Sequence, residues 1–295
     1  MSDSEIQTLL AKFDLLSSTY LRDEVDEALN HQEALTPHLL RIIEDAGENP
    51  LRQVLEEHNA HVYAATLLSH FREPAAHLPL VRAFSVAPEP LADLWGDMTT
   101  ETLPTLLYNT CNGSIEAIKE LVVNRTIDQY VRCAAMEALS YVAAFDPSRR
   151  DEVVQFLQGL FTGEEADRES YFWGNLAATL CDLHPGDSME IIRKAFDDKI
   201  VQPGFIGWGN VEVASELSRE AAQESLQTWV KARMPADIHG YISWFAEFHQ
   251  EELEQPPEQP EKPQQPEKKN KPENKKKSGD TKNKAAKKAR KKNRR

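Results

Sequence analysis

Two histidines in the first third of the chain have a spacing that could serve metal chemistry. His58 and His61 are three residues apart and follow Glu57, so both rings could lie on one face of a helix. A zinc site needs a third protein ligand in a tight cluster, and the longer His-Glu-x-x-His spacing of zinc hydrolases is missing. The pattern favours surface or helix-capping histidines, with metal binding as the weaker alternative.

A second candidate is the pair Cys181-x-x-His184, which is half of a zinc-binding pattern. No second half lies nearby, so we interpret it as a buried cysteine next to a histidine that ends a helix. A catalytic Cys/His pair is the alternative, because catalytic partners can be distant in sequence. Cys111 and Cys133 also fall in apolar helical patterns, which suits a reducing cytosol rather than a disulfide framework. We therefore predict no catalytic residue, no bound metal and no cofactor.

The segment 202–210 is rich in glycine, but it does not fit the Gly-x-Gly-x-x-Gly phosphate-binding pattern and follows no predicted strand. We predict a turn that packs Phe205, Ile206 and Trp208 against the last helices. A small-ligand pocket at this place is the alternative.

The elements that must carry these residues have helical periodicity. In 128–144, Val131, Ala135, Ala138 and Val142 recur at i, i+4, i+7 and i+11, which places them on one face of a helix. A helix of this kind needs a neighbour to cover its apolar face.

A second helix follows each such helix after a short turn. Ser148 and Asp151 form a Ser-x-x-Asp capping box after Pro147, and Gly163 supplies the stop. The second helices of successive pairs begin near positions 114, 148 and 188, and these spacings of 34 and 40 residues are typical of helical solenoids. A lone pair could not cover its apolar face, so the pairs must stack.

The rest of residues 1–250 adds further helices. Thr36-Pro37 is a favourable helix start, and 211–232 and 238–248 are expected to be C-terminal capping helices. The sequence therefore predicts an all-α fold. Residues 1–250 are expected to form a HEAT-like α-solenoid of stacked antiparallel helix pairs, and residues 251–295 a disordered C-terminal tail.

One helix carries a more specific pattern. Asp128-x-x-Val131-Arg132-x-x-Ala135-x-x-x-Leu139 resembles the first helix of a HEAT repeat. The resemblance implies that Asp128 and Arg132 take part in a polar ladder between neighbouring repeats, while the apolar residues pack inside.

A wider resemblance covers most of residues 20–245. The stretches 60–64, 67–73, 130–135 and 205–208, which read AHVYA, LLSHFRE, YVRCAA and FIGW, are similar to a bacterial family known as domain of unknown function 1186. The resemblance implies a HEAT-like helical fold without an established activity, so it supplies no catalytic residues. Some members of that family end in a Cys/His-rich zinc-binding SEC-C segment, and this chain has a Lys/Pro-rich tail there instead.

Charge divides the chain into two opposite parts. Residues 1–254 carry 18 Lys and Arg against 43 Asp and Glu, a formal charge of −25, whereas residues 255–295 carry 16 basic and 5 acidic residues, a charge of +11. No aromatic residue follows Phe248, so the tail cannot bury enough apolar surface to fold. It serves either as a solubilising tether or as a non-specific contact for RNA or another polyanion, through neutralised phosphates. The candidate contacts are Lys275, Lys276, Lys277, Lys287, Lys288, Arg290, Lys291, Lys292, Arg294 and Arg295.

These observations favour a non-enzymatic scaffold or adaptor that binds a protein partner, and the acidic body favours a basic one. The alternatives are an RNA- or ribosome-associated factor that uses the tail, and an uncharacterised metal-dependent enzyme.

The first residues lack the basic region and the apolar region of a secretory signal. No run of about 18 apolar residues could span a membrane, so we expect a cytoplasmic protein.

Overall fold

The computed structural model describes residues 1–15, 17, 19–202, 204–234 and 237–245. Contacts between residues divide the chain into two units, Met1–Glu254 and Gln255–Arg295. All described residues belong to the first unit. The expected disordered tail, 251–295, lies outside the described residues.

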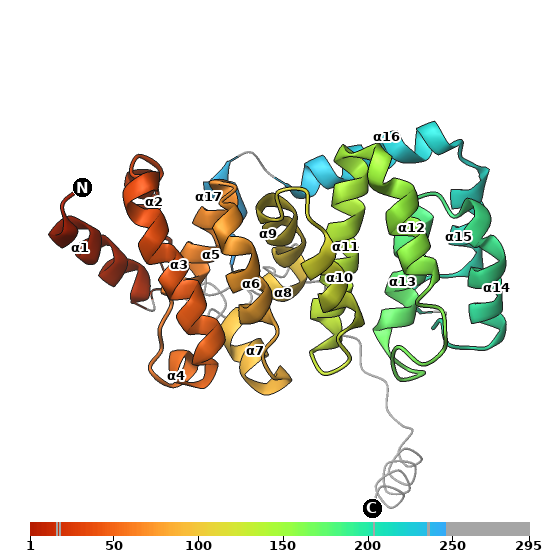
Figure 1. Ribbon diagram of the computed structural model, residues 1–295, viewed down its shortest axis with the longest axis horizontal. Helices are drawn as coiled ribbons and strands as arrows, with labels where there is room; N and C mark the ends of the chain where they lie inside the picture. Colours follow the sequence, from red (N-terminus) through yellow and green to blue (C-terminus); the bar gives the residue numbers. More distant parts are fainter. Residues whose placement is uncertain (16, 18, 203, 235–236, 246–295) are drawn as a thin grey trace, which may run out of the picture. The chain divides into compact units, whose positions relative to one another are not determined.

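Helices of different lengths make up the first half of the unit, and the described part of the chain contains no strand (Figure 1). They are α1 (Asp3–Asp14), α2 (Arg22–Leu29), α3 (Gln32–Glu48), α4 (Pro50–Leu55), α5 (Ala60–His70), α6 (His77–Phe84), α7 (Pro88–Trp95), α8 (Met98–Glu101) and α9 (Leu103–Thr110).

The second half continues in the same way. Its helices are α10 (Glu116–Val123), α11 (Gln129–Phe145), α12 (Arg150–Gln158), α13 (Tyr171–Asp182), α14 (Met189–Asp197), α15 (Trp208–Glu216), α16 (Arg219–Arg233) and α17 (Ile238–Ile242). Short 3-10 turns occur at Pro74–Ala76, Pro147–Arg149 and Gly186–Ser188. The all-α class expected from the sequence is confirmed.

Polar side chains fix where several helices begin. The Ser2 side chain accepts from the Glu5 amide and Glu5 bonds back to the Ser2 amide, which is a reciprocal capping box at α1. Asp128 accepts from the Tyr130 amide at the start of α11, and Ser218 accepts from the Ala221 amide at the start of α16. These bonds satisfy amides that have no partner inside the helix.

Three predicted boundaries are wrong. α3 begins at Gln32 and contains Pro37, so Thr36-Pro37 does not start it. Pro37 lies in the second turn, where it has no amide to donate to the Glu33 carbonyl. Asp146, not Ser148, accepts the amide bond before α12, whose first residue is Arg150. The segment 211–232 forms two helices, because Leu217 leaves the helical conformation and Ser218 caps a new one.

α11 is the central helix of the unit. It contacts α9, α10, α12, α13 and α16. Its predicted inner face is confirmed, since Val131, Ala135 and Ala138 have no exposed surface and Val142 is buried. A helix surrounded on several sides is apolar over most of its circumference.

The last two helices run back over earlier ones instead of capping the end of the chain. α16 packs against α11, and α17 packs against α5 (Figure 1). Gln223 donates to the carbonyls of Ala143 and Ala144 at 3.1 and 2.8 Å, which satisfies acceptors at the end of α11. The Tyr241 hydroxyl donates to the Thr102 carbonyl at 3.1 Å. These long-range contacts correct the interpretation of 211–232 and 238–245 as capping helices; residues 246–248 of the second predicted helix lie outside the described residues.

None of the helices in the described residues combines the length and apolar character that crossing a membrane requires.

Candidate functional site

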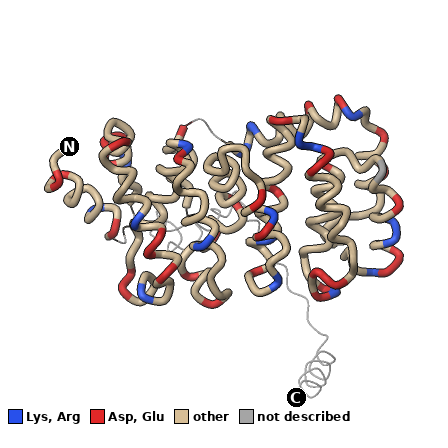
Figure 2. Tube along the Cα trace, in the orientation of Figure 1, with Lys and Arg blue, Asp and Glu red and all other residues tan. Residues whose placement is uncertain are grey.

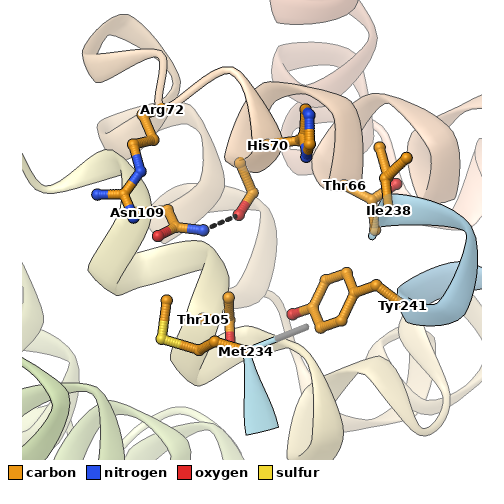
Figure 3. Close-up of a pocket in the computed structure, with 9 residues that line it drawn as sticks. Thr66, His70, Arg72, Thr105, Asn109, Met234, Ile238 and Tyr241 are labelled. Carbon is orange, nitrogen blue, oxygen red and sulfur yellow. Dashed lines mark hydrogen bonds between the residues drawn. The ribbon is translucent and has the colours of Figure 1, made fainter. Parts of the chain in front are cut away.

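A polar pocket of about 320 Å³ lies where α5, α9 and α17 meet (Figure 3). Its lining comes from three segments that are distant in sequence. The residues are Thr66, Ser69, His70, Arg72, Thr105, Asn109, Met234, Ile238 and Tyr241.

Two hydroxyl groups of this pocket, those of Ser69 and Thr66, are occupied by hydrogen bonds within the fold. Asn109 Nδ2 donates to Ser69 Oγ at 3.1 Å, and the Thr66 hydroxyl donates to the Val62 carbonyl at 2.9 Å. Partial burial lowers the pKa of His70, with Asp237 opposing this effect. Among the described residues, the pocket holds no hydrogen-bonded pair of nucleophile and base, which covalent catalysis would require. Its volume is large enough to admit a small polar molecule.

A second concave site is larger and more apolar. We call it the α15 groove; it has a volume of about 410 Å³ and lies between α13, α15 and α16. It is lined by Ala178, Cys181, Asp182, Phe205, Ile206, Asn210, Val213, Ala214, Leu217, Ala222, Ser225, Leu226 and Trp229.

The lining of the α15 groove follows helical periodicity on all three sides. Positions 210, 213, 214 and 217 on α15 and its C-terminal cap are spaced i, i+3, i+4 and i+7, as are 222, 225, 226 and 229 on α16. Positions 178, 181 and 182 on α13 follow the same rule. Each helix therefore turns one continuous stripe toward the groove.

Large apolar side chains in the α15 groove remain exposed to solvent. The exposed fractions are 43% for Phe205, 64% for Val213, 42% for Leu217 and 38% for Trp229. The Phe205 ring also lies 6.1 Å from the Tyr171 ring, which is exposed as well. Apolar residues that gather in one exposed place, rather than being scattered, commonly mark an interaction site.

Asp182 is the one charged residue that lines the groove. Surrounding atoms partly desolvate its carboxyl group, and this effect, together with the Glu137 carboxylate, raises the pKa of Asp182 to about 6. The side chain still has contact with solvent, because the residue as a whole is exposed. Glu137 itself is paired, since it accepts from the Tyr141 hydroxyl at 2.7 Å and lies 3.2 Å from Arg233 Nε. Within the described residues, no cation pairs with Asp182.

The two predicted histidine candidates have different surroundings. His58 precedes α5, with Nδ1 2.7 Å from Asp14 and Nε2 3.0 Å from Glu56. Partial burial opposes protonation, but the bonds to both carboxylates outweigh it and raise the pKa of His58. The His61 ring is buried and its Nε2–H donates to the Leu94 carbonyl at 2.6 Å. Burial lowers the pKa of His61 to about 4.

Cys181 and His184 lie at the end of α13. His184 follows the helix with φ 68° and its Nε2–H donates to the Leu217 carbonyl at 3.0 Å, so it is a helix-ending histidine as predicted. Cys181 is half-buried, and burial raises the pKa of its thiol to about 12. A thiol held protonated in this way is a poor nucleophile and a poor metal ligand.

No group of three His, Cys, Asp or Glu side chains suited to hold a metal ion occurs within the described residues. The ten predicted polyanion contacts, from Lys275 to Arg295, lie outside them. Their role stays a prediction.

The sequence does not reveal the α15 groove as a site. It predicts a turn with Phe205, Ile206 and Trp208, and the first two do line the groove. Phe205 lies against α13, because a Cβ atom at Gly174 would come within 2.7 Å of its ring. Trp208 packs instead under Arg193, whose guanidinium lies 3.6 Å from the centre of the indole ring. The missed signal is the pair of apolar stripes at 210–217 and 222–229, which a single predicted helix over 211–232 had merged.

The described residues thus form an all-α protein with an apolar groove and a polar pocket. The chain belongs to the family described as protein of unknown function (DUF1186), whose model matches residues 4–249. It is 28% identical over 208 residues to an uncharacterized protein of Chlamydia muridarum (strain MoPn / Nigg), covering 70% of this chain and 82% of that protein.

A second relative comes from Chlamydia trachomatis serovar D (strain ATCC VR-885 / DSM 19411 / UW-3/Cx) and is also an uncharacterized protein. It is 27% identical over 193 residues, which cover 65% of this chain and 76% of the relative. No solved structure matches the chain significantly.

Proposed function

We propose that residues 1–250 form a HEAT-like α-solenoid of stacked antiparallel helix pairs that serves as a non-enzymatic scaffold or adaptor for a protein partner. A repeated sequence separation supports the stacking. Six side chains bond to a group 33 residues further along the chain. The pairs are His61–Leu94, His77–Thr110, Lys119–Glu152, Arg132–Glu165, Arg150–Leu183 and His184–Leu217.

A constant separation of this size is what stacked helix pairs produce, because equivalent positions of neighbouring pairs lie side by side. Arg132 also stands at the position where the HEAT pattern has its arginine. It is buried, donates to the Val122 and Glu165 carbonyls at 2.8 and 2.9 Å, and stacks on Phe172. The Asp128 side chain caps its own helix. Of the two residues expected in the polar ladder, Arg132 is therefore the one that bonds to the following segment.

The main support for the proposed binding function is the exposed apolar lining of the α15 groove. Leaving Phe205, Val213, Leu217 and Trp229 in water has a free-energy cost that burial against a partner would remove. Acidic residues are spread along the helices and connecting segments of the unit (Figure 2), which favours a basic partner. The cysteines Cys111, Cys133 and Cys181 are free thiols, which suits the proposed cytoplasmic location.

Affinity capture tests this function. The tagged full-length chain is incubated at moderate salt with nuclease-treated lysate of the organism that makes it. We expect one protein in near-stoichiometric amount, both with the natural tail and with the ten basic tail residues changed to Gln. Recovery of nothing above background would contradict the proposal.

The tail composition favours a second candidate, an RNA- or ribosome-associated factor. Its +11 charge would neutralise phosphates and make binding salt-dependent. In the same capture without nuclease, this function predicts RNA that is lost when the ten basic residues become Gln. Equal RNA recovery with both chains would reject it.

A metal-dependent enzyme is the remaining alternative from the sequence, with His58, His61, Cys181 and His184 as its ligand candidates. It predicts stoichiometric zinc or iron in the purified protein. Elemental analysis of the full chain distinguishes it from the scaffold, for which we expect no bound metal.

A further inference from the structure

α15 is covered on one side only. Val211 is its one buried residue, and its exposed side chains include Val213 on the helix and Leu217 at its cap. The opposite wall of the groove, on α16, carries the exposed Trp229. A helix pair in a globular protein normally covers such stripes with a third helix.

The groove also contains a carboxylate without a counter-charge. Asp182 lies among apolar side chains, and within the described residues no Lys, Arg or His pairs with it. The segment 208–229 adds Glu212, Glu216, Glu220 and Glu224 against a single cation, Arg219, which is already paired with Asp151. A charge that is partly desolvated and unpaired is stabilised when a cation binds beside it.

We propose that the α15 groove binds an amphipathic helix of the partner protein, whose apolar face fills the space between α13, α15 and α16 and carries a Lys or Arg that pairs with Asp182. This inference rests on the proposed scaffold function and names its docking site and the chemistry of its partner. Helix-in-groove recognition uses anchors at i, i+3, i+4 and i+7. The groove offers stripes of that same spacing on both walls.

The same features argue against other occupants. The described residues provide no sheet edge to which an extended strand could add. Asp182 and the four glutamates of 208–229 would repel the phosphates of a nucleic acid or of an anionic membrane. An apolar and cationic helix satisfies both the uncovered stripes and the unpaired carboxylate.

A peptide series on the full-length protein tests this inference. Three fluorescent amphipathic peptides of about 14 residues, four helical turns, share one Leu/Ala apolar face and differ only at its centre, which is Lys, Gln or Glu. We expect the Lys peptide to bind at least about 5-fold more tightly than the Gln peptide, and the Glu peptide most weakly. Asp182→Asn should remove the preference for Lys without removing binding of the Gln peptide.

Two valine variants provide the site control. Val213→Asp should weaken binding of all three peptides about 10-fold or more, and Val123→Asp, an exposed valine on α10, should leave binding unchanged. Circular dichroism verifies that both variants fold. Absence of peptide binding, equal affinity for Lys and Gln peptides, or equal effects of the two valine variants would each overturn the inference. Because no cellular partner takes part, these outcomes are separate from failure of the capture experiment.

Discussion

At the scale of single residues, burial decides what each histidine does. His58 and His61 are only three positions apart, but His58 lies between two carboxylates that raise its pKa, whereas burial lowers the pKa of His61 to about 4. His58 therefore pairs with carboxylates in front of α5, whereas His61 donates a hydrogen bond to a backbone carbonyl within the core. Their spacing alone could not reveal this, because it depends on Asp14 and Leu94 from other helices.

His61 makes stability depend on pH in a defined direction. Its pKa in the folded protein lies below the ordinary value of 6.5, so the unfolded chain takes up the proton first and stability is lost as pH falls from about 6.5 to 4. The shift corresponds to about 3 kcal/mol. We expect His61→Gln, which can still donate to Leu94, to be less stable at pH 7.5 but to lose much of this acid sensitivity.

Urea unfolding at pH 7.5, 5.5 and 4.5 measures the effect, with His38→Gln, at a half-buried position of α3, as the control. The same acid sensitivity in His61→Gln and the natural protein would show that His61 is not its source.

Asp182 behaves in the opposite sense. Its pKa of about 6 lies above the ordinary value of 3.8, so its charged form costs folding free energy, and this cost grows as pH rises from about 3.8 to 6. Asp182→Asn should therefore stabilise the free protein above pH 6, by no more than about 1 kcal/mol because the exposed side chain is screened by solvent. Thermal unfolding at pH 5 and pH 8 tests this, with Asp93→Asn on α7 as control. A loss of stability at pH 8 would mean that Asp182 has a stabilising partner within the fold.

At the scale of elements, arginines link neighbouring helices through backbone carbonyls. Arg132 donates to Val122 and Glu165, and Arg150 donates to Leu183 at 2.9 Å. Each bond satisfies a carbonyl near a helix end or in a connecting segment, where no partner exists within the helix. The HEAT-like pattern singled out Arg132, but its acceptors could not be read from sequence, since backbone carbonyls leave no residue signature.

Arg132→Met tests this link, because methionine keeps the apolar contact with Phe172 but donates no hydrogen bond. We expect a loss of about 3 kcal/mol in the free energy of unfolding, as is usual when buried acceptors lose a charged donor. Arg125→Met, at an exposed position between α10 and α11, should cost less than about 0.5 kcal/mol. Urea denaturation compares the two, and equal losses would show that the Arg132 bonds do not stabilise the fold.

At the scale of the whole unit, periodicity predicted the helical class and the inner face of α11 because both follow from local apolar spacing. The return of α16 over α11 and of α17 to α5 could not be predicted in this way. It depends on Gln223 and Tyr241 reaching carbonyls 80 and 139 residues away. The α15 groove was missed for the same reason, since it exists only where three separate stripes meet.

The charge of the unit is the reason for which we propose a basic partner. A body of −25 repels phosphate and attracts cationic proteins over a distance set by salt. In the proposed complex, contacts with the apolar groove would add short-range affinity, which charge alone does not provide. The proposed partner therefore needs both a cationic and an apolar surface.

We propose above all that this protein binds a protein partner through the α15 groove. The most direct measurement is capture of that partner from cell lysate by the full-length chain and by two single variants, Val213→Asp in the groove and Val123→Asp on α10. Both valines are exposed, at 64% and 42%, so neither change should unfold the chain. We expect Val213→Asp to lose the partner and Val123→Asp to keep it. Retention of the partner by Val213→Asp would show that the groove is not the binding site.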